Sequence, residues 1–362
     1  MKRIAIQTFW TSEYNYGQIL QGYALQHFLK EKGYDAYIIR FDCLLSRLKE
    51  LFSIVLKGKL LQNYRQGRLR HFAEFKQLNI QYSSKYYGTF HKLQVSPPDA
   101  DYYIVGSDQV WTYMRNEERR NGYLLRFGGS KVKKIAYAAS FGRDNLKNTE
   151  ISTFKDALDA FSFVGVREES GMDICRKIGI ESCWVLDPVA LLSLSHWTKM
   201  TIPIINKALD KKPNVFFYSL TDGTQTPSIY HIMDELAEKY IVYYTNSSQN
   251  FDKRMNITPS IEEWISYINQ CDFVVTDSFH CTLFCLILQK NFVTIKRHNG
   301  EGMSNRLISL LNRLNLNERY TDALPKSVEK MLNMPIEWKN VNEKLRLWRQ
   351  ESEIQLLNAL EK

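Results

Sequence analysis

The sequence predicts an α/β protein with two Rossmann-like domains that face each other across a cleft. Short apolar strands alternate with amphipathic helices along most of the chain, which is the pattern of parallel sheets. The alternation occurs in two successive series, separated by a polar stretch with two prolines at 194–213. The chain has 362 residues, which exceeds the roughly 250–300 residues that one hydrophobic core usually organises.

The first series begins at the N-terminus. A strand is predicted at 3–8, followed by a helix that carries Leu20, Ala24 and Phe28 at four-residue spacing, and by a second strand at 37–39. Further strands are predicted at 102–105, 135–139, 163–166 and 183–186, with a helix at 168–178. Parallel strands joined by helices follow directly from this order.

The second series has strands predicted at 215–220, 241–245, 273–276 and 292–295. A capping box begins one helix at Ser260 and Glu263, and another helix begins at about Phe279. The stretch 338–360 is amphipathic and is expected to pack back across both domains. We therefore expect domains at 1–193 and 194–333 and a C-terminal helix at 334–362.

Charge and composition limit the kinds of partner. There are 48 basic and 39 acidic residues, so the net charge of +9 favours anionic partners without choosing among phosphorylated metabolites, lipid headgroups and nucleic acid. Nucleic acid is not expected, because no recognisable binding motif occurs. The stretch from Arg47 to Lys76 is basic and amphipathic, which fits either a solvated helix or peripheral contact with an anionic membrane.

Neither a signal sequence nor a membrane-spanning run is apparent. Only three apolar residues follow Lys2 and Arg3, and no apolar run approaches about 18 residues. We expect a cytoplasmic protein, with a peripheral position at the inner face of the membrane as an open alternative. The six cysteines show no C-x-x-C spacing, so we expect reduced thiols and no metal site. No cofactor is expected either.

The candidate site residues follow predicted strands, because ligands of such sheets bind beyond the carboxyl ends of the strands. Asn15 and Gly17 form either a turn or a helix N-terminus that binds an anion, and neither a P-loop nor a dinucleotide fingerprint is present. Asp108 could cap a helix or serve as a carboxylate base. Ser140 and Gly142 could form an anion-binding nest or a tight turn.

Two further residues carry the strongest chemical signals. Arg167 ends a strand and must reach solvent or an anion, unless Glu168 and Glu169 hold it in a surface pair. His280 is predicted in the first turn of an apolar helix capped by Asp277 or Ser278, where the helix dipole favours the neutral imidazole and proton transfer. The other histidines lack a comparable setting: His27, His71, His91, His196, His231 and His298.

These motifs, taken in order, resemble the polysaccharide pyruvyl transferase family. The matching segments are N-Y-G at 15–17, G-S-D-Q-V-W at 106–111, A-S-F-G at 139–142, V-R-E-E-S-G at 166–171, D-P at 187–188, T-D-S-F-H at 276–280 and G-M-S-N-R at 302–306. Each is weak alone. Together they span residues 1 to about 320 and form a fairly specific signal.

The resemblance implies a GT-B-like pair of domains and a defined reaction. Phosphoenolpyruvate would be the donor, and a nucleotide- or lipid-linked saccharide precursor of a surface polysaccharide would be the acceptor. The product would be a pyruvate ketal, with phosphate released. The family's donor arginine and histidine match Arg167 and His280, the helix start near Asn15 would border the cleft, and Asp108 could be a second base.

One residue departs from the family pattern. Many members carry an arginine two residues before the histidine, and this chain has Ser278 there. Serine cannot replace a bidentate guanidinium, so another cation substitutes or the donor differs. Arg306 is the candidate substitute, with Lys296 and Arg297 behind it. The alternatives are a GT-B glycosyltransferase that uses a nucleotide sugar and a non-catalytic, glycan-binding family member.

Overall fold

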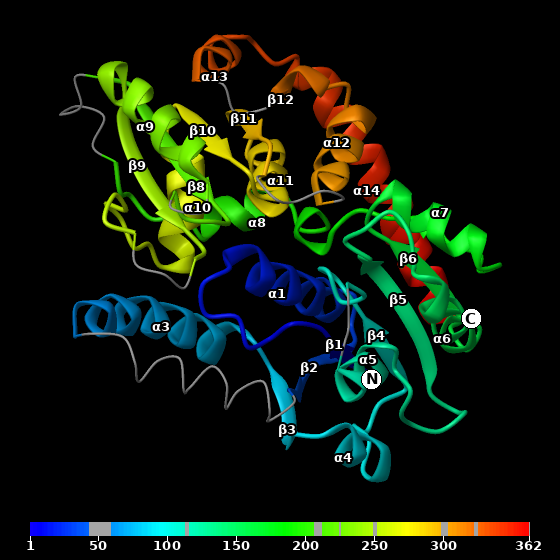
Figure 1. Ribbon diagram of the computed structural model, residues 1–362. Coiled ribbons are helices and arrows are strands. Elements are labelled where there is room, and N and C mark those ends of the chain that lie inside the picture. Colours follow the sequence, from blue (N-terminus) through cyan, green and yellow to red (C-terminus); the bar gives the residue numbers. More distant parts are fainter. Residues whose placement is uncertain are drawn as a thin grey trace.

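The computed structural model describes residues 1–42, 59–112, 116–205, 212–223, 226–248, 252–297, 303–321 and 325–361. They form two α/β domains, one above the other, and each is built on a parallel sheet with helices on its faces (Figure 1). The expected fold class is therefore confirmed.

The N-terminal domain contains a seven-stranded sheet in the order β3-β2-β1-β4-β5-β6-β7, with every neighbouring pair parallel. Chain order reverses between β1 and β4, the position where such sheets bind ligands. The strands are β1 (Arg3–Gln7), β2 (Asp35–Phe41), β3 (Tyr82–Tyr87), β4 (Tyr102–Val105), β5 (Lys133–Ala139), β6 (Phe163–Val166) and β7 (Cys183–Trp184). The helices are α1 (Tyr16–Glu31), α3 (Lys59–Asn79), α4 (Phe90–Val95), α5 (Glu117–Tyr123), α6 (Asn148–Leu158), α7 (Glu169–Lys177) and the 3-10 turn η1 (Pro188–Ala190).

The C-terminal domain contains a five-stranded parallel sheet in the order β12-β11-β10-β8-β9. Its strands are β8 (Asn214–Ser219), β9 (Ile241–Asn246), β10 (Phe273–Thr276), β11 (Asn291–Ile295) and β12 (Tyr320–Thr321). Its helices are α9 (Pro227–Lys239), α10 (Ile261–Gln270), α11 (Phe279–Ile287), α12 (Met303–Arg313), the 3-10 turn η2 (Asn317–Arg319) and α13 (Pro325–Leu332). The predicted capping box at the start of α10 is present.

The structure adds elements that the sequence did not indicate. The edge strand β3 reads YSSKYY, and its polar centre hides the strand pattern. Within the predicted connection at 194–213, α8 (Leu194–Lys199) forms and buries Trp197 fully. The predicted boundaries at 193 and 333 stay predictions. The described cysteines are free thiols, as expected, and Cys43 lies outside the described residues.

The two domains pack directly on each other through the first turn of α1. The Tyr16 ring stacks on Trp264 of α10, with 5.2 Å between ring centroids and 7° between their planes. The Tyr16 hydroxyl donates to the Pro259 carbonyl at 2.7 Å. Since Asn15 immediately precedes this anchor, the start of α1 is held at the junction between the domains.

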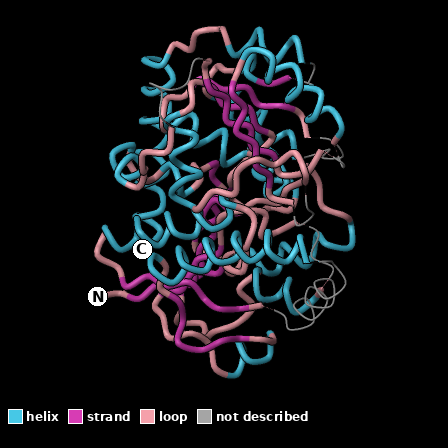
Figure 2. Tube along the Cα trace, turned by 90° about the vertical axis from the view of Figure 1, so that its left-hand side faces the viewer, coloured by secondary structure: helices cyan, strands magenta, loops and turns pink. Residues whose placement is uncertain are grey.

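The C-terminal helix α14 (Trp338–Glu361) returns to the N-terminal domain, as predicted. The Ser352 hydroxyl accepts from the Leu186 amide at 2.9 Å. At the end of the helix, the Leu360 carbonyl accepts from the Tyr102 hydroxyl and from the Lys2 ammonium group. The two ends of the chain consequently lie near each other (Figure 2).

The basic stretch from Arg47 to Lys76 is only partly within the described residues, because 43–58 lie outside them. In its described part, Arg68 of α3 is fully buried and donates to the carbonyls of Tyr14 and Asn246. This part therefore bridges the two domains. None of the helices in the described ranges is both long enough and apolar enough to cross a membrane.

Candidate functional site

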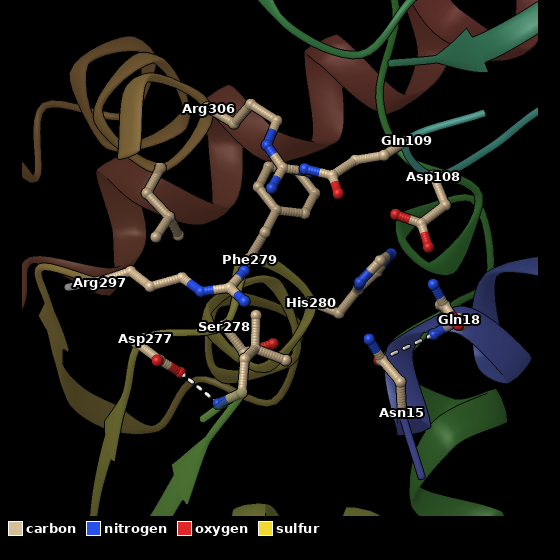
Figure 3. Close-up of a pocket in the computed structure, with 12 residues that line it drawn as sticks. Asn15, Gln18, Asp108, Gln109, Asp277, Ser278, Phe279, His280, Arg297 and Arg306 are labelled. Carbon is tan, nitrogen blue, oxygen red and sulfur yellow. Dashed lines mark hydrogen bonds between the residues drawn. The ribbon is translucent and has the colours of Figure 1, made fainter. Parts of the chain in front are cut away.

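A pocket lies between the two domains where strand ends from both sheets meet (Figure 3). The N-terminal domain supplies residues that follow β1 and β4. The C-terminal domain supplies residues that follow β8, β10 and β11 and one turn of α12. The lining consists of Asn15, Gln18, Asp108, Gln109, Leu220, Asp277, Ser278, Phe279, His280, Arg297, Arg306 and Leu307.

Two helices begin at this pocket. The Asn15 side chain caps α1 by accepting from the Gln18 amide at 3.2 Å, and the Ser278 hydroxyl caps α11 by accepting from the Cys281 amide at 3.3 Å. Helix N-termini carry partial positive charge and attract anions. The structure thus brings Asn15 and Ser278 into one pocket, and it assigns the α11 cap to Ser278 rather than Asp277.

Arg167 forms the centre of a buried charge network beside the pocket. Its Nη1 donates to Asp187 Oδ2 at 3.0 Å, and its Nη2 donates to Asp108 Oδ1 at 3.4 Å. The Ser107 hydroxyl also donates to Asp187, at 2.7 Å. The Arg167 side chain has no exposed surface and does not line the pocket, so the alternative of a surface pair with Glu168 and Glu169 is wrong.

His280 joins this network from the other domain. Its Nε2 lies 3.3 Å from Asp187 Oδ2 and 3.3 Å from Arg167 Nη1. On the opposite side, Gly17 packs so closely that a Cβ there would lie 2.3 Å from His280 Nδ1. The imidazole is therefore held between two elements of the N-terminal domain. Gly17 does not line the pocket, and the structure assigns it a packing role in place of the expected anion contact.

The network keeps its carboxylates ionised. Burial alone would raise the pKa of Asp187, but His280, Arg167 and the Ser107 hydroxyl outweigh burial and lower it. Burial also opposes ionisation of Asp108, and the charges of Arg167, His280 and Arg306 again lower the pKa. Because a lowered pKa makes a weak base, the structure favours a positioning role for Asp108 over the predicted second base.

Arg306 presents a buried positive charge to the pocket. Its guanidinium and that of Arg167 both lie over the Phe279 ring, at 5.9 and 4.7 Å from the centroid. The Gln109 amide oxygen, once oriented towards Arg306, accepts from Nη2 at 2.7 Å. Burial, reinforced by the like charge of Arg167, lowers the pKa of Arg306 to about 10. Among the described residues no carboxylate pairs with Arg306, and its Nε has no partner.

The turn at Ser140 and Gly142 binds an anion that belongs to the protein itself. The amides of Phe141 and Gly142 donate to Glu168 Oε1, at 2.9 and 3.4 Å. Gly142 has a φ of 61°, and a Cβ there would lie 2.3 Å from Thr112 Oγ1. Neither Ser140 nor Gly142 lines the pocket, so their expected donor contact is replaced by this internal one.

Several residues of the site had no catalytic or binding role predicted from the sequence. Asp187 follows the predicted strand at 183–186 just as Asp108 follows that at 102–105, and this shared position was the available signal. Gln109 and Phe279 carry no such signal.

Asp277 lines the pocket but is bonded within its own domain. Its carboxylate accepts from the Leu220 amide at 2.7 Å and from the Ser219 hydroxyl at 3.2 Å, and burial raises its pKa to about 6.

Comparison with known proteins identifies the family. The profile of the polysaccharide pyruvyl transferase family matches residues 15–299, which include both sides of the pocket. The chain belongs to the polysaccharide pyruvyl transferase family. No curated protein matches it significantly.

Solved structures of other enzymes share the two-domain fold of this family member. The UDP-GlcNAc 2-epimerase of Methanocaldococcus jannaschii is similar over 98% of this chain and 100% of its own, with a TM-score of 0.50 and 14% identity. The same enzyme in complex with UDP-GlcNAc and UDP gives a TM-score of 0.51 at 14% identity, covering 96% and 99% of the two chains. The structure of S. aureus MnaA with UDP gives a TM-score of 0.50 at 10% identity, and the match covers 98% of this chain and 91% of that one. At these identities the similarity shows the GT-B fold alone.

Proposed function

We propose that this transferase moves the enolpyruvyl group of phosphoenolpyruvate onto a sugar of a surface polysaccharide precursor as a pyruvate ketal. The observation that carries the proposal is that the buried Arg306 guanidinium and His280 line one pocket, in which two helices begin. Such a pocket suits a small, highly charged anion. A donor with a carboxylate and a phosphate would supply the ion-pair partner that Arg306 lacks among the described residues.

The chemistry requires groups of the kind found here. The donor's methylene carbon takes up a proton and becomes a methyl group, while two sugar hydroxyl oxygens bond to the adjacent carbon and the C–O bond to phosphate breaks. The hydroxyls lose two protons, of which one balances the proton taken up by the methylene carbon and the other leaves with the phosphate. His280 is placed to carry a proton, because it lines the pocket while Asp187 and Arg167 orient its ring. Arg306 and Arg297 line the same pocket and would stabilise the departing phosphate.

The arrangement also bears on the departure at Ser278. The serine hydroxyl is occupied by capping α11, and the Arg306 guanidinium reaches the same pocket from α12. A guanidinium from a second helix can offer the bidentate contact that serine cannot. This supports Arg306 as the functional substitute for the family arginine.

A binding experiment tests the donor. The full chain is titrated with phosphoenolpyruvate, inorganic phosphate, UDP and UDP-GlcNAc while its thermal unfolding is followed. A ligand at a hundredfold excess over Kd stabilises the folded state by about 2.7 kcal/mol, so a clear rise in Tm is expected with phosphoenolpyruvate. A rise with the two nucleotides alone would instead favour the glycosyltransferase alternative.

Two variants make this test specific. Arg306→Ala is expected to weaken phosphoenolpyruvate binding at least tenfold and to raise KM correspondingly. Arg176→Ala removes the same charge from an exposed site on α7, so it controls for the net charge of the protein. Equal binding by both variants would remove Arg306 from the donor site. No ligand response at all would favour a non-catalytic family member.

The acceptor and the location are proposed on the family's activity. A saccharide precursor linked to a nucleotide or a lipid fits a cytoplasmic enzyme, and a lipid-linked one would bring it to the inner face of the membrane. Flotation with liposomes containing anionic lipid tests peripheral binding. Recovery of the protein only in the unbound fraction would count against membrane contact.

A further inference from the structure

A group of polar side chains lies between α1 and α8, apart from the pocket. Tyr23, His27 and Glu31 are spaced by four residues and form one stripe along α1. His196 of α8 faces this stripe, with 4.5 Å between its ring centroid and that of His27. His27 Nε2 lies 3.3 Å from Glu31 Oε1. Two imidazoles and a carboxylate therefore converge from two helices.

The distances in this group match those of a metal centre. One ligand atom from each of His27, Glu31 and His196 lies within 4.8 Å of the other two. Bonds of about 2.0–2.1 Å to a tetrahedral ion place neighbouring ligand atoms about 3.3 Å apart. The His27–Glu31 pair already has this separation, and the other separations are within reach of side-chain rotation, since none of the three residues is fully buried. Two imidazoles and one carboxylate are a ligand set that suits zinc.

The surroundings prepare His196 as a ligand. His196 is only partly exposed, and its ring lies against the rings of Tyr23 and Trp197 as well as that of His27. The Tyr23 hydroxyl lies 3.0 Å from His196 Nε2 and can fix the ring orientation, as partners behind metal ligands commonly do.

We propose that His27, Glu31 and His196 bind a divalent transition metal ion, with zinc as the best match, and that water completes its coordination. No metal site was expected from the cysteine spacing, and these three ligands show no motif spacing, because they come from helices more than 160 residues apart in the chain. The inference does not depend on the proposed reaction.

The position of the site indicates a structural role. His27 lies ten residues beyond Gly17 on α1, which corresponds to about 15 Å along the helix. An ion there would not reach the pocket. It would join α1, whose first turn lines the pocket, to α8, which precedes the C-terminal sheet. A bound ion is thus expected to stabilise the junction between the domains and to leave phosphoenolpyruvate binding unchanged.

Equilibrium dialysis of the metal-free full chain against Zn²⁺ tests the site. We expect one ion per chain and a higher Tm with Zn²⁺. His27→Gln and Glu31→Gln should each weaken binding at least tenfold and remove the rise in Tm. Both positions are partly exposed, so both variants should remain folded, which Tm without metal verifies.

His231→Gln, which changes an exposed histidine on α9, is the matched control and should bind as the wild type does. Two results would overturn the proposal. One is the absence of stoichiometric Zn²⁺ binding by the wild type. The other is unchanged binding by the folded His27→Gln and Glu31→Gln variants, because the ion would then lie elsewhere.

Discussion

Replacing Gly17 by alanine tests whether the close contact between α1 and His280 sets the geometry of the site. The added Cβ would lie 2.3 Å from Nδ1, 2.4 Å from Cγ and 2.5 Å from Cβ of His280. Ordinary contacts begin at 3.4 Å, so the imidazole must move by about 1 Å. That movement would break its contact with Asp187, now 3.3 Å.

The magnitude combines two opposing effects. Alanine is favoured over glycine in a helix by about 1 kcal/mol. Forcing an extra carbon into a packed region costs about 1–3 kcal/mol. The free energy of unfolding should therefore fall by up to about 2 kcal/mol. A catalytic group displaced by about 1 Å can cost about a hundredfold in rate, and the affinity for phosphoenolpyruvate should also fall at least tenfold.

Urea unfolding and calorimetric titration with phosphoenolpyruvate measure the two effects. Gly67→Ala is the control, because it also lies inside a helix and a Cβ there meets nothing within 4 Å. The control should gain stability and bind the donor normally. If Gly17→Ala behaved in the same way, the position of His280 would not depend on Gly17 and the reasoning would fail.

Three further predictions concern buried polar groups. Arg167→Met removes the guanidinium that contacts both Asp187 and Asp108 and should lower the free energy of unfolding by about 3–5 kcal/mol at pH 7. A loss below about 1 kcal/mol in urea unfolding would contradict this. Burial raises the pKa of Asp277 from 3.8 to about 6 in the folded state, so the stability that its protonation contributes is fully present below pH 4 and is lost as the pH rises through 6. Over this range the free energy of unfolding of the wild type should fall by up to about 3 kcal/mol relative to that of Asp277→Asn. Parallel plots of the free energy of unfolding against pH for the two proteins would refute the shift. Ser352→Ala removes two buried hydrogen bonds and should cost about 1–3 kcal/mol, measured by thermal unfolding, whereas an unchanged Tm would show that water replaces them.

The sequence predicted the buried strands well, because their signal is local. β4 and β10 are four-residue, largely apolar runs followed by Gly106 and Asp277, and both were predicted with the observed bounds. The edge strand β3 was missed, since an edge strand need not be apolar throughout. The positions of Arg167 and His280 just beyond strand ends were likewise predictable, because the strand pattern is local and ligands of such sheets bind beyond the carboxyl ends of the strands.

Contacts between the domains could not be predicted in this way. Arg167 and His280 meet through Asp187, and Gln109 meets Arg306, only because two sheets dock with their carboxyl ends together. Docking depends on surfaces formed by residues far apart in the chain. Similarly, Ser140 and Gly142 have the sequence of an anion nest, but whether Glu168 or a ligand fills it depends on the fold of the following helix.

The return of α14 to the N-terminal domain restricts how the pocket can open. Within the described residues, the chain passes from the N-terminal to the C-terminal sheet between β7 and β8, and it returns to the N-terminal domain with α14. A pair of domains joined by two chain crossings can bend relative to each other about the line through both crossings, whereas twisting about other axes would strain one of the crossings. Rotation of one domain over the other would have to pull α14 from its bonds to Leu186 and Tyr102. We therefore expect substrate to enter when the two domains bend apart at the pocket while α14 stays in place on the N-terminal domain.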